Sequence, residues 1–239
     1  MTDMANYTYL KYQGHLVVNL SGRQYLLDTG SPFSVGTEPI SIAGMEFLVQ
    51  DSYLDLTPAS LVENIGLPLE GLIGADIIKA FTVSVFPAER VIQFNHLPAA
   101  GELLVPIKQF TSVPILPIGV QGKVLQVFLD TGSPLSYLPL ELLAGLEPRG
   151  LRDVYYPLLG NFTTQEYLVD TNIGGERCPL HFGALPQALE ALTVAGSVQG
   201  ILGTEILKHF GLSLSLQQGV LMLEKRAGLR LVQNEEASS

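Results

Sequence analysis

Residues 25–34 read YLLDTGSPFS, and residues 127–136 read VFLDTGSPLS. In each copy an apolar run leads into Asp-Thr-Gly-Ser-Pro, so a strand is expected to end in a sharp turn that presents an aspartate. One isolated Asp-Thr-Gly is typical of an ordinary turn, but two copies in matching surroundings indicate a functional site. The repeat therefore predicts equivalent roles for Asp28 and Asp130.

A second pair of matching segments follows in the same order. Residues 71–81 read GLIGADIIKAF, and residues 200–210 read GILGTEILKHF. Two blocks that recur in the same order indicate a tandem duplication. We expect residues 1–100 to form one lobe and residues 101–239 a second, joined by a linker at residues 97–101.

The composition narrows the class of protein. Of 239 residues, 47% are apolar and 15% are charged, so the chain is expected to fold. The net charge of −10 disfavours binding to nucleic acid or to anionic membranes, because both require basic side chains. Cys178 is the single cysteine, so neither an intrachain disulfide nor a cysteine-based metal site is expected. No signal peptide or membrane-spanning run is visible, which favours a cytoplasmic location.

Apolar periodicity and turn residues predict a mostly β protein with few short helices. Hairpins are expected around Ser21-Gly22 and Gln121-Gly122. Short helical turns are expected at residues 75–80 and 204–209, and one longer helix at residues 138–146. The predicted fold class is therefore all-β.

The second half carries an extra segment. Ile42 lies 14 residues after Asp28, whereas its counterpart Ile173 lies 43 residues after Asp130, a difference of 29. The extra piece spans roughly residues 138–169. We expect it to hold the longer helix and then a hairpin, with strands at residues 154–156 and 162–168 and a tip near residues 159–161.

The two DTGS copies, together with Leu72-Ile73-Gly74 and Ile201-Leu202-Gly203, resemble the motifs of the aspartic peptidases, and within that family those of the bacterial retropepsin-like proteins. The resemblance covers roughly residues 15–94 and 113–223. It implies an acid-protease fold, in which two β lobes related by a pseudo-twofold axis form an intramolecular pseudo-dimer, so a monomer is expected. It also implies an endopeptidase that acts on a peptide or protein substrate, with no cofactor and no metal.

The chemistry of peptide hydrolysis accounts for a pair of aspartates. Two carboxylates about 3 Å apart cannot both ionise, so Asp28 and Asp130 would hold a single proton. The ionised member would draw a proton from a water molecule, and the protonated member would donate to the developing oxyanion. Because the pair titrates as a unit, the residues alone do not assign the acid and the base.

The resemblance also implies roles for the neighbours of the two aspartates. The threonines would hydrogen-bond across the axis, the glycines would let backbone N–H groups reach the carboxylates, and the serine hydroxyls would donate to the outer carboxylate oxygens and lower the pKa values. Two further glycines would support the active loops by close packing, or would simply begin a helix. In chain order these residues are Thr29, Gly30, Ser31, Gly74, Thr131, Gly132, Ser133 and Gly203.

In this family a hairpin of the kind expected at about residues 153–170 closes over the substrate as a flap. The present chain would then have a single flap, supplied by its second half. An extended peptide would pair with the flap and place its side chains in apolar pockets. The candidate substrate-binding residues, each of which could equally be an ordinary packing residue, are Phe33, Leu135, Tyr137, Tyr155, Tyr156, Gly160 and Asn161.

Two alternatives stay open. The chain could be a peptide-binding or structural module that keeps the fold without cutting, because the first half lacks a flap. It could also be a self-processing protease with one dedicated target. Two facing carboxylates repel each other and are costly to retain without catalysis, so the enzyme is favoured.

Overall fold

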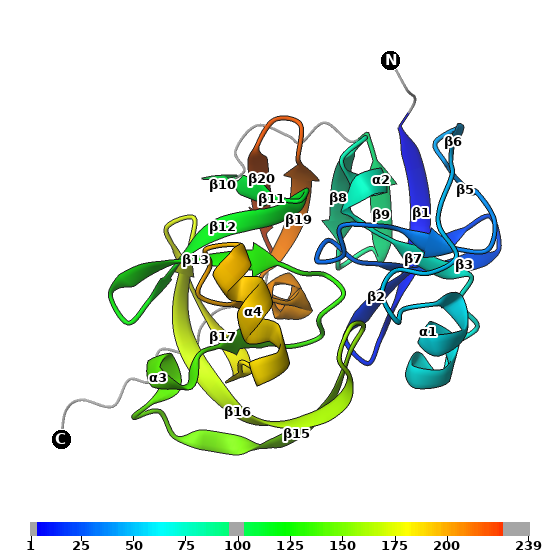
Figure 1. Ribbon diagram of the computed structural model, residues 1–239. Helices are drawn as coiled ribbons and strands as arrows, with labels where there is room; N and C mark the ends of the chain where they lie inside the picture. The colour runs from blue at the N-terminus through cyan, green and yellow to red at the C-terminus, as the bar shows by residue number, and fades with distance from the viewer. Residues whose placement is uncertain (1–3, 96–102, 227–239) are drawn as a thin grey trace.

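The computed structural model describes residues 4–95 and 103–226. The expected linker at residues 97–101, and with it the boundary between the two expected lobes, lies outside the described residues. The described chain is all-β, as predicted, with two large sheets and a few short helices (Figure 1). Within these residues no helix is long and apolar enough to cross a membrane.

The first half, residues 1–100, is built mainly from hairpins. At the β2–β3 turn, Ser21 and Gly22 have φ angles of 53° and 93°, the left-handed conformation that a two-residue hairpin turn requires. The elements are β1 (Ala5–Tyr12), β2 (His15–Leu20), β3 (Arg23–Leu27), β4 (Val35–Gly36), β5 (Ile40–Ile42), β6 (Met45–Phe47), α1 (Pro58–Ile65), β7 (Gly71–Ile73), α2 (Ala75–Ile78), β8 (Thr82–Phe86) and β9 (Val91–Phe94).

The second half, described for residues 103–226, contains counterparts of the main elements of the first half together with additional strands. Gln121 and Gly122 form the equivalent turn, with φ angles of 50° and 77°. The elements are β10 (Leu103–Pro106), β11 (Lys108–Phe110), β12 (Val113–Val120), β13 (Lys123–Leu129), β14 (Ser136–Leu138), α3 (Leu140–Leu143), β15 (Pro148–Tyr156), β16 (Gly160–Ile173), β17 (Glu176–Ala184), α4 (Gln187–Ala195), β18 (Ile201–Leu202), the 3₁₀ helix η1 (Thr204–Lys208), β19 (Phe210–Ser215) and β20 (Val220–Lys225).

One sheet joins the two halves. In this sheet β8 of the first half pairs antiparallel with β19 of the second, which places Ser84 opposite Ser213. The largest apolar cluster also draws on both halves, for example through Phe94 and Leu221. Because this core is shared, the halves cannot separate without exposing apolar surface to water.

Each half contains the same three-strand motif. β3 pairs in parallel with β7, which pairs antiparallel with β4. In the same way β13 pairs in parallel with β18, which pairs antiparallel with β14. Asp28 and Asp130 directly follow β3 and β13, so the two motifs present the two aspartates from equivalent places.

The extra residues of the second half form the hairpin of β15 and β16, in which Tyr156 lies opposite Gly160. Its tip is the turn at residues 157–159, slightly earlier than predicted. The predicted helix at residues 138–146 is wrong, since only Leu140–Leu143 is helical. The helix stops because Ala144 adopts an extended ψ of 132° and Gly145 has a φ of 86°. Neither α1 nor α4 was predicted.

Candidate active site

Asp28 and Asp130 are held at the ends of their strands by equivalent backbone hydrogen bonds. The Asp28 N–H donates to the carbonyl of Ile73, and the Asp130 N–H donates to the carbonyl of Leu202, each at 2.9 Å. Both side chains are buried, with 3% and 2% of their surface exposed. Buried carboxyl groups need hydrogen-bonding partners, and the surrounding loops supply them.

Thr29 and Thr131 bind each other's loops. The Thr29 N–H donates to Thr131 Oγ1, and the Thr131 N–H donates to Thr29 Oγ1, both at 3.0 Å. The Thr29 hydroxyl then donates to the carbonyl of Leu129 at 2.7 Å, and the Thr131 hydroxyl donates to that of Leu27 at 2.8 Å. These four buried bonds cross between the halves, as the resemblance implied, and fix the two aspartates in register.

Gly30 and Gly132 bring the two carboxyl groups close together. A Cβ atom at Gly30 would lie 2.3 Å from Asp130 Cγ, and one at Gly132 would lie 2.3 Å from Asp28 Cγ, so neither position accepts a side chain. Their N–H groups donate to the Oδ1 atoms of Asp28 and Asp130 at 2.8 and 2.9 Å. Each carboxyl therefore packs against the glycine of the opposite loop.

The two carboxyl groups have different surroundings. Burial, and then the negative charge of Asp130, raise the pKa of Asp28 well above its usual range. Burial also raises the pKa of Asp130, but hydrogen bonds from Tyr156 and from Asp28 to its carboxylate lower it. These surroundings favour a proton on Asp28 and a negative charge on Asp130.

The roles inferred for Ser31 and Ser133 are wrong. Their hydroxyls do not donate to the carboxylates but to backbone carbonyls, Ser31 to Phe33 at 2.8 Å and Ser133 to Leu135 at 2.6 Å. The turn at the following proline brings the carbonyl two residues ahead within reach, and a serine hydroxyl readily makes such a local bond. The hydroxyls of these serines therefore shape the loops, and it is their backbone N–H groups that lower the pKa values of Asp28 and Asp130.

Gly74 and Gly203 pack against the active loops. A Cβ atom at either position would lie 2.6 Å from a backbone carbonyl of the adjacent loop. Both residues also directly precede a short helix, so each glycine supports an active loop and also leads into a helix. Their N–H groups donate to the hydroxyls of Ser34 and Ser136, at 2.8 and 3.0 Å. These two serines were missed, although they close the repeated ten-residue stretch that reveals the site.

The β15–β16 hairpin reaches from the second half across to the first (Figure 1). Near its tip the Tyr156 hydroxyl donates to Asp130 Oδ2 at 2.7 Å. Burial, and then the charge of Asp130, raise the pKa of Tyr156, which keeps the hydroxyl protonated as a donor. After the turn, where Gly160 has a φ of 78°, the Asn161 side chain donates to Asn64 Oδ1 on α1 at 3.1 Å.

Tyr155 points the other way and joins an apolar cluster of the first half. Its ring lies edge-on to His15, with 5.7 Å between ring centroids. His15 is 1% exposed, and burial lowers its pKa to about 4, so the imidazole is neutral. A lone histidine carries no sequence signal, and its place beside the hairpin was missed.

A cavity of about 230 Å³ opens beside Asp130 and Gly30. Most of its walls are apolar, namely Pro32, Phe33, Tyr53, Phe110, Val113, Phe128, Tyr156, Leu158, Leu192 and Ile201. Of the three residues expected to line a substrate pocket after the catalytic turns, Phe33 does so. Leu135 and Tyr137 are instead wholly buried in a second-half cluster, since β14 runs into the interior.

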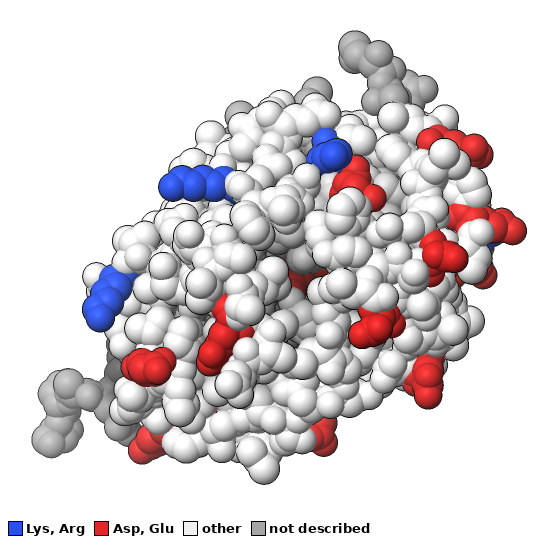
Figure 2. Space-filling model, in the orientation of Figure 1, with Lys and Arg blue, Asp and Glu red and all other residues white. Residues whose placement is uncertain are grey.

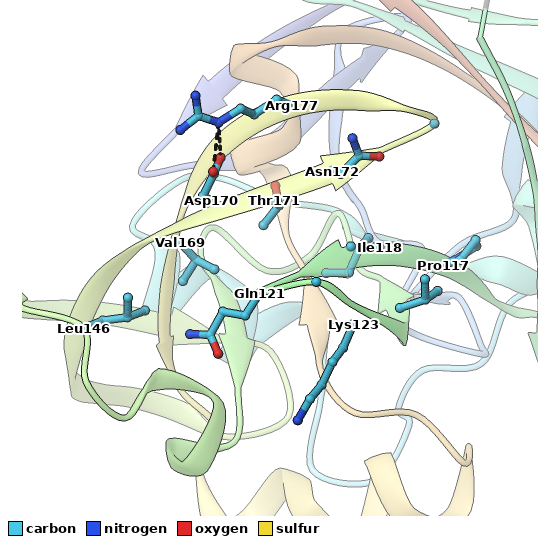
Figure 3. Close-up of a pocket in the computed structure, with 14 residues that line it drawn as sticks. Pro117, Ile118, Gln121, Lys123, Leu146, Val169, Asp170, Thr171, Asn172 and Arg177 are labelled. Atoms are coloured by element: carbon cyan, nitrogen blue, oxygen red, sulfur yellow. Dashed lines mark hydrogen bonds and ion pairs between the residues drawn. The ribbon is translucent and has the colours of Figure 1, made fainter. Parts of the chain in front are cut away.

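A larger concave region of about 790 Å³ lies elsewhere, around the β12–β13 and β16–β17 turns (Figure 3). Asp170 is the single acidic residue among those that line it, and it accepts a hydrogen bond from Arg177 Nε at 2.7 Å. Because this region lacks a second carboxylate, it does not offer the chemistry predicted for the two aspartates.

Charge on the surface follows the composition. On the face seen in Figure 2, acidic side chains are spread over both halves, while the basic ones are few. No group of three or more His, Cys, Asp or Glu residues that could hold a metal ion is found within residues 4–95 and 103–226.

Comparisons with known proteins add distant structural likeness. No protein-family model matches the sequence, and no curated protein matches it. Among solved structures, a retropepsin-like aspartic protease from Rickettsia conorii is similar with a TM-score of 0.37 and 17% identity, over 52% of this chain and 89% of that chain. At such a distance the function must be argued from the residues of the site.

Proposed function

We propose that the protein is an aspartic endopeptidase that uses Asp28 and Asp130 to hydrolyse peptide bonds. The observation that carries the proposal is the pair of buried carboxyl groups from equivalent loops, packed against each other and clamped by the exchange between Thr29 and Thr131. Such a pair has one proton to donate and one charge to accept a proton, which hydrolysis by water requires.

The proposal includes the organisation of the chain. Residues 1–100 and 101–239 would act as two lobes, and one chain would suffice because it supplies both aspartates. The matching motifs that end in Asp28 and Asp130 support this reading.

The unequal protonation suggests how the roles divide. Asp130, as the ionised member, takes a proton from a water molecule whose oxygen attacks the carbonyl carbon of the substrate. Asp28 gives its proton to the carbonyl oxygen, so the intermediate is a neutral gem-diol. Asp130 then passes its proton to the amide nitrogen, the C–N bond breaks, and Asp28 recovers a proton from the gem-diol as the new carboxylic acid forms.

The β15–β16 hairpin must move before this chemistry can begin. The Tyr156 hydroxyl bonds to Asp130 Oδ2, the oxygen that would otherwise accept the proton of the water. We therefore propose that the hairpin is a flap seen in its closed position, and that substrate enters when Tyr156 leaves Asp130.

Peptide cleavage tests the proposal. The wild-type protein is incubated with a mixed peptide library from pH 3 to pH 8, and products are identified by mass spectrometry. We expect cleavage that is lost in both Asp28→Asn and Asp130→Asn. The matched control, Asp170→Asn, removes an exposed carboxylate outside the site and should leave cleavage intact.

A peptide-binding module that does not cut is the second candidate, and one observation favours it. The Tyr156 hydroxyl already donates a hydrogen bond to Asp130, and the bond from Asn161 to Asn64 holds the hairpin to the first half. Absence of cleavage at every pH, with peptide binding retained, would establish the module and refute the enzyme.

A further inference from the structure

The cavity beside Asp130 is large enough to hold a substrate side chain. An apolar cavity of about 150 Å³ can bind benzene, and this one measures about 230 Å³. Phe33 and Tyr53 come from the first half, Phe110 and Phe128 from the second, and Leu158 from the hairpin tip. A large apolar side chain placed here would leave water and contact aromatic rings on several sides.

The equivalent position in the first half is filled. Phe128 and Ile201, which line the cavity, align in the duplicated sequence with Leu26 and Leu72. All four side chains are buried, but the cluster of the two leucines also contains residues of α1 and the ring of Tyr155. α1 precedes β7 as α4 precedes β18, so the same elements surround a vacant cavity in one half and a tyrosine in the other.

Tyr155 lies on the Asp28 side of the site. Its side chain is 4% exposed, and burial, followed by the charge of Asp28, raises the pKa of its hydroxyl to about 12. Neighbouring residues of a strand point to opposite faces. Tyr155 therefore reaches into the first half, while Tyr156 reaches Asp130 and the wall of the vacant cavity.

We propose that the site selects one large apolar side chain, on one side of the scissile bond only, and that Tyr155 occupies the equivalent position on the other side. This inference rests on the proposed function and deepens it. A residue such as Phe or Leu in the vacant cavity improves binding and cleavage. The substrate residue across the scissile bond is not selected for size, because Tyr155 fills the space that would receive it once the hairpin has closed again over the substrate.

Binding to a full-length protein that cannot cut tests the inference first. The Asp28→Asn variant is titrated with three fluorescent peptides that differ only in two central residues, Ala-Ala, Phe-Ala and Phe-Phe. We expect Phe-Ala to bind at least about tenfold more tightly than Ala-Ala, and Phe-Phe to bind no more tightly than Phe-Ala. A tenfold gain from the second Phe, or none from the first, would overturn the inference.

Variants of the two positions sharpen the test. Combined with Asp28→Asn, Tyr155→Ala should make Phe-Phe bind about tenfold more tightly than Phe-Ala, whereas Tyr155→Phe keeps the ring and should change nothing. Leu192→Trp fills the vacant cavity from α4 and should abolish the preference for Phe-Ala. Val194→Trp, on an exposed part of the same helix, is the matched control and should preserve it.

Mapping of cleavage sites separates this inference from the proposed function. Wild-type cleavage with apolar residues enriched on one side of the cut supports both. Cleavage with equal enrichment on both sides, or with none, refutes the inference and leaves the enzyme in place. Selective binding in the three-peptide assay without any wild-type cleavage refutes the enzyme and supports the one-sided pocket.

Discussion

Both aspartates accept hydrogen bonds from backbone N–H groups of their own loops, and Asp130 also accepts one from the Tyr156 hydroxyl. The two aspartates are equivalent in sequence, so their difference comes from a side chain on the hairpin that only the second half carries. A hydrogen bond donated to a carboxylate favours its ionised form. The asymmetry of the pair is thus set by one residue outside the repeated motif.

Tyr156→Phe should move the acid limb of the pH profile of kcat/KM to higher pH. The hydroxyl lowers the pKa of Asp130, so its loss raises that pKa, and the charged base is then lost at a higher pH. The measurement is cleavage of one peptide across pH 3 to 8. Tyr167→Phe, near the base of the same hairpin, is the control, and an acid limb that stays in place would contradict the role of Tyr156.

Thr29→Ala should destabilise the whole protein by about 2 to 4 kcal/mol. The change leaves the buried Leu129 carbonyl without its donor and the Thr131 N–H without its acceptor. Urea unfolding gives the free energy, and Thr29→Ser, which retains the hydroxyl, should recover most of it. Equal stability of Thr29→Ala and wild type would show that the exchange does not hold the halves together.

At the scale of single residues, the sequence predicted what the repeat imposes and missed what tertiary contacts decide. The threonine exchange and the close glycines follow from two identical loops that face each other. The Ser31 hydroxyl had two acceptors within reach, and local loop geometry selected the carbonyl of Phe33. The bond from Tyr156 to Asp130 depends on how far the β15–β16 hairpin reaches across the site, and no local sequence pattern indicates that reach.

At the scale of elements, the hairpin of β15 and β16 is held by ion pairs along its length and by buried and exposed contacts near its tip. Midway along β15, Arg152 Nη1 lies 2.7 Å from Glu166 Oε1 and 3.9 Å from the buried Glu205. At the tip, the hydrogen bond between Asn161 and Asn64 is exposed, so water competes for it. Opening of the tip therefore requires the loss of this exposed bond together with the release of Tyr155 and Tyr156 from their buried positions.

Asn161→Ala should loosen the tip while leaving the rest of the fold unchanged. Hydrogen exchange measured by mass spectrometry should become faster in peptides that cover residues 153–165, because the link to α1 is removed. Asn172→Ala, which removes a similar bond in the turn between β16 and β17, is the control and should not affect that region. Unchanged exchange near the tip would mean that Tyr155 and Tyr156 alone hold it closed.

Helices were the least predictable elements. α1 begins with a reciprocal cap between Thr57 and Ser60, with Pro58 in the first turn, which is a recognisable local signal. α4 follows Pro186 without a side-chain cap, so its start is defined by packing. α3 ends at Leu143 although the apolar pattern of the sequence continues. The chain turns at Gly145, where φ is 86°, before β15 begins.

At the scale of the whole molecule, the sheet that contains β8 and β19 makes the two halves one folding unit. Where these two strands pair, Ser84 Oγ and Ser213 Oγ form a buried pair of hydroxyls at 2.6 Å. The repeat predicted two similar halves, but it did not indicate which residues of β8 and β19 would lie opposite each other. That register depends on strand pairing between positions that are 129 residues apart.

A double-mutant cycle measures this junction. Ser84→Ala or Ser213→Ala alone should lower the free energy of unfolding by about 1 to 2 kcal/mol, since each leaves the other hydroxyl buried without its partner. The double variant should cost clearly less than the sum of the two, because no orphaned hydroxyl remains. Strict additivity in urea unfolding would show that the two hydroxyls do not interact.

The order in which the shared sheet can be completed has a consequence for a newly made chain. Asp28 leaves the ribosome long before Asp130, and β19, the partner of β8, comes near the end of the described chain. A half-synthesised polypeptide of the proposed enzyme therefore contains one acid without its companion and cannot attack its neighbours. The pair of aspartates on which the proposed function depends thus forms only after the second copy has emerged and docked.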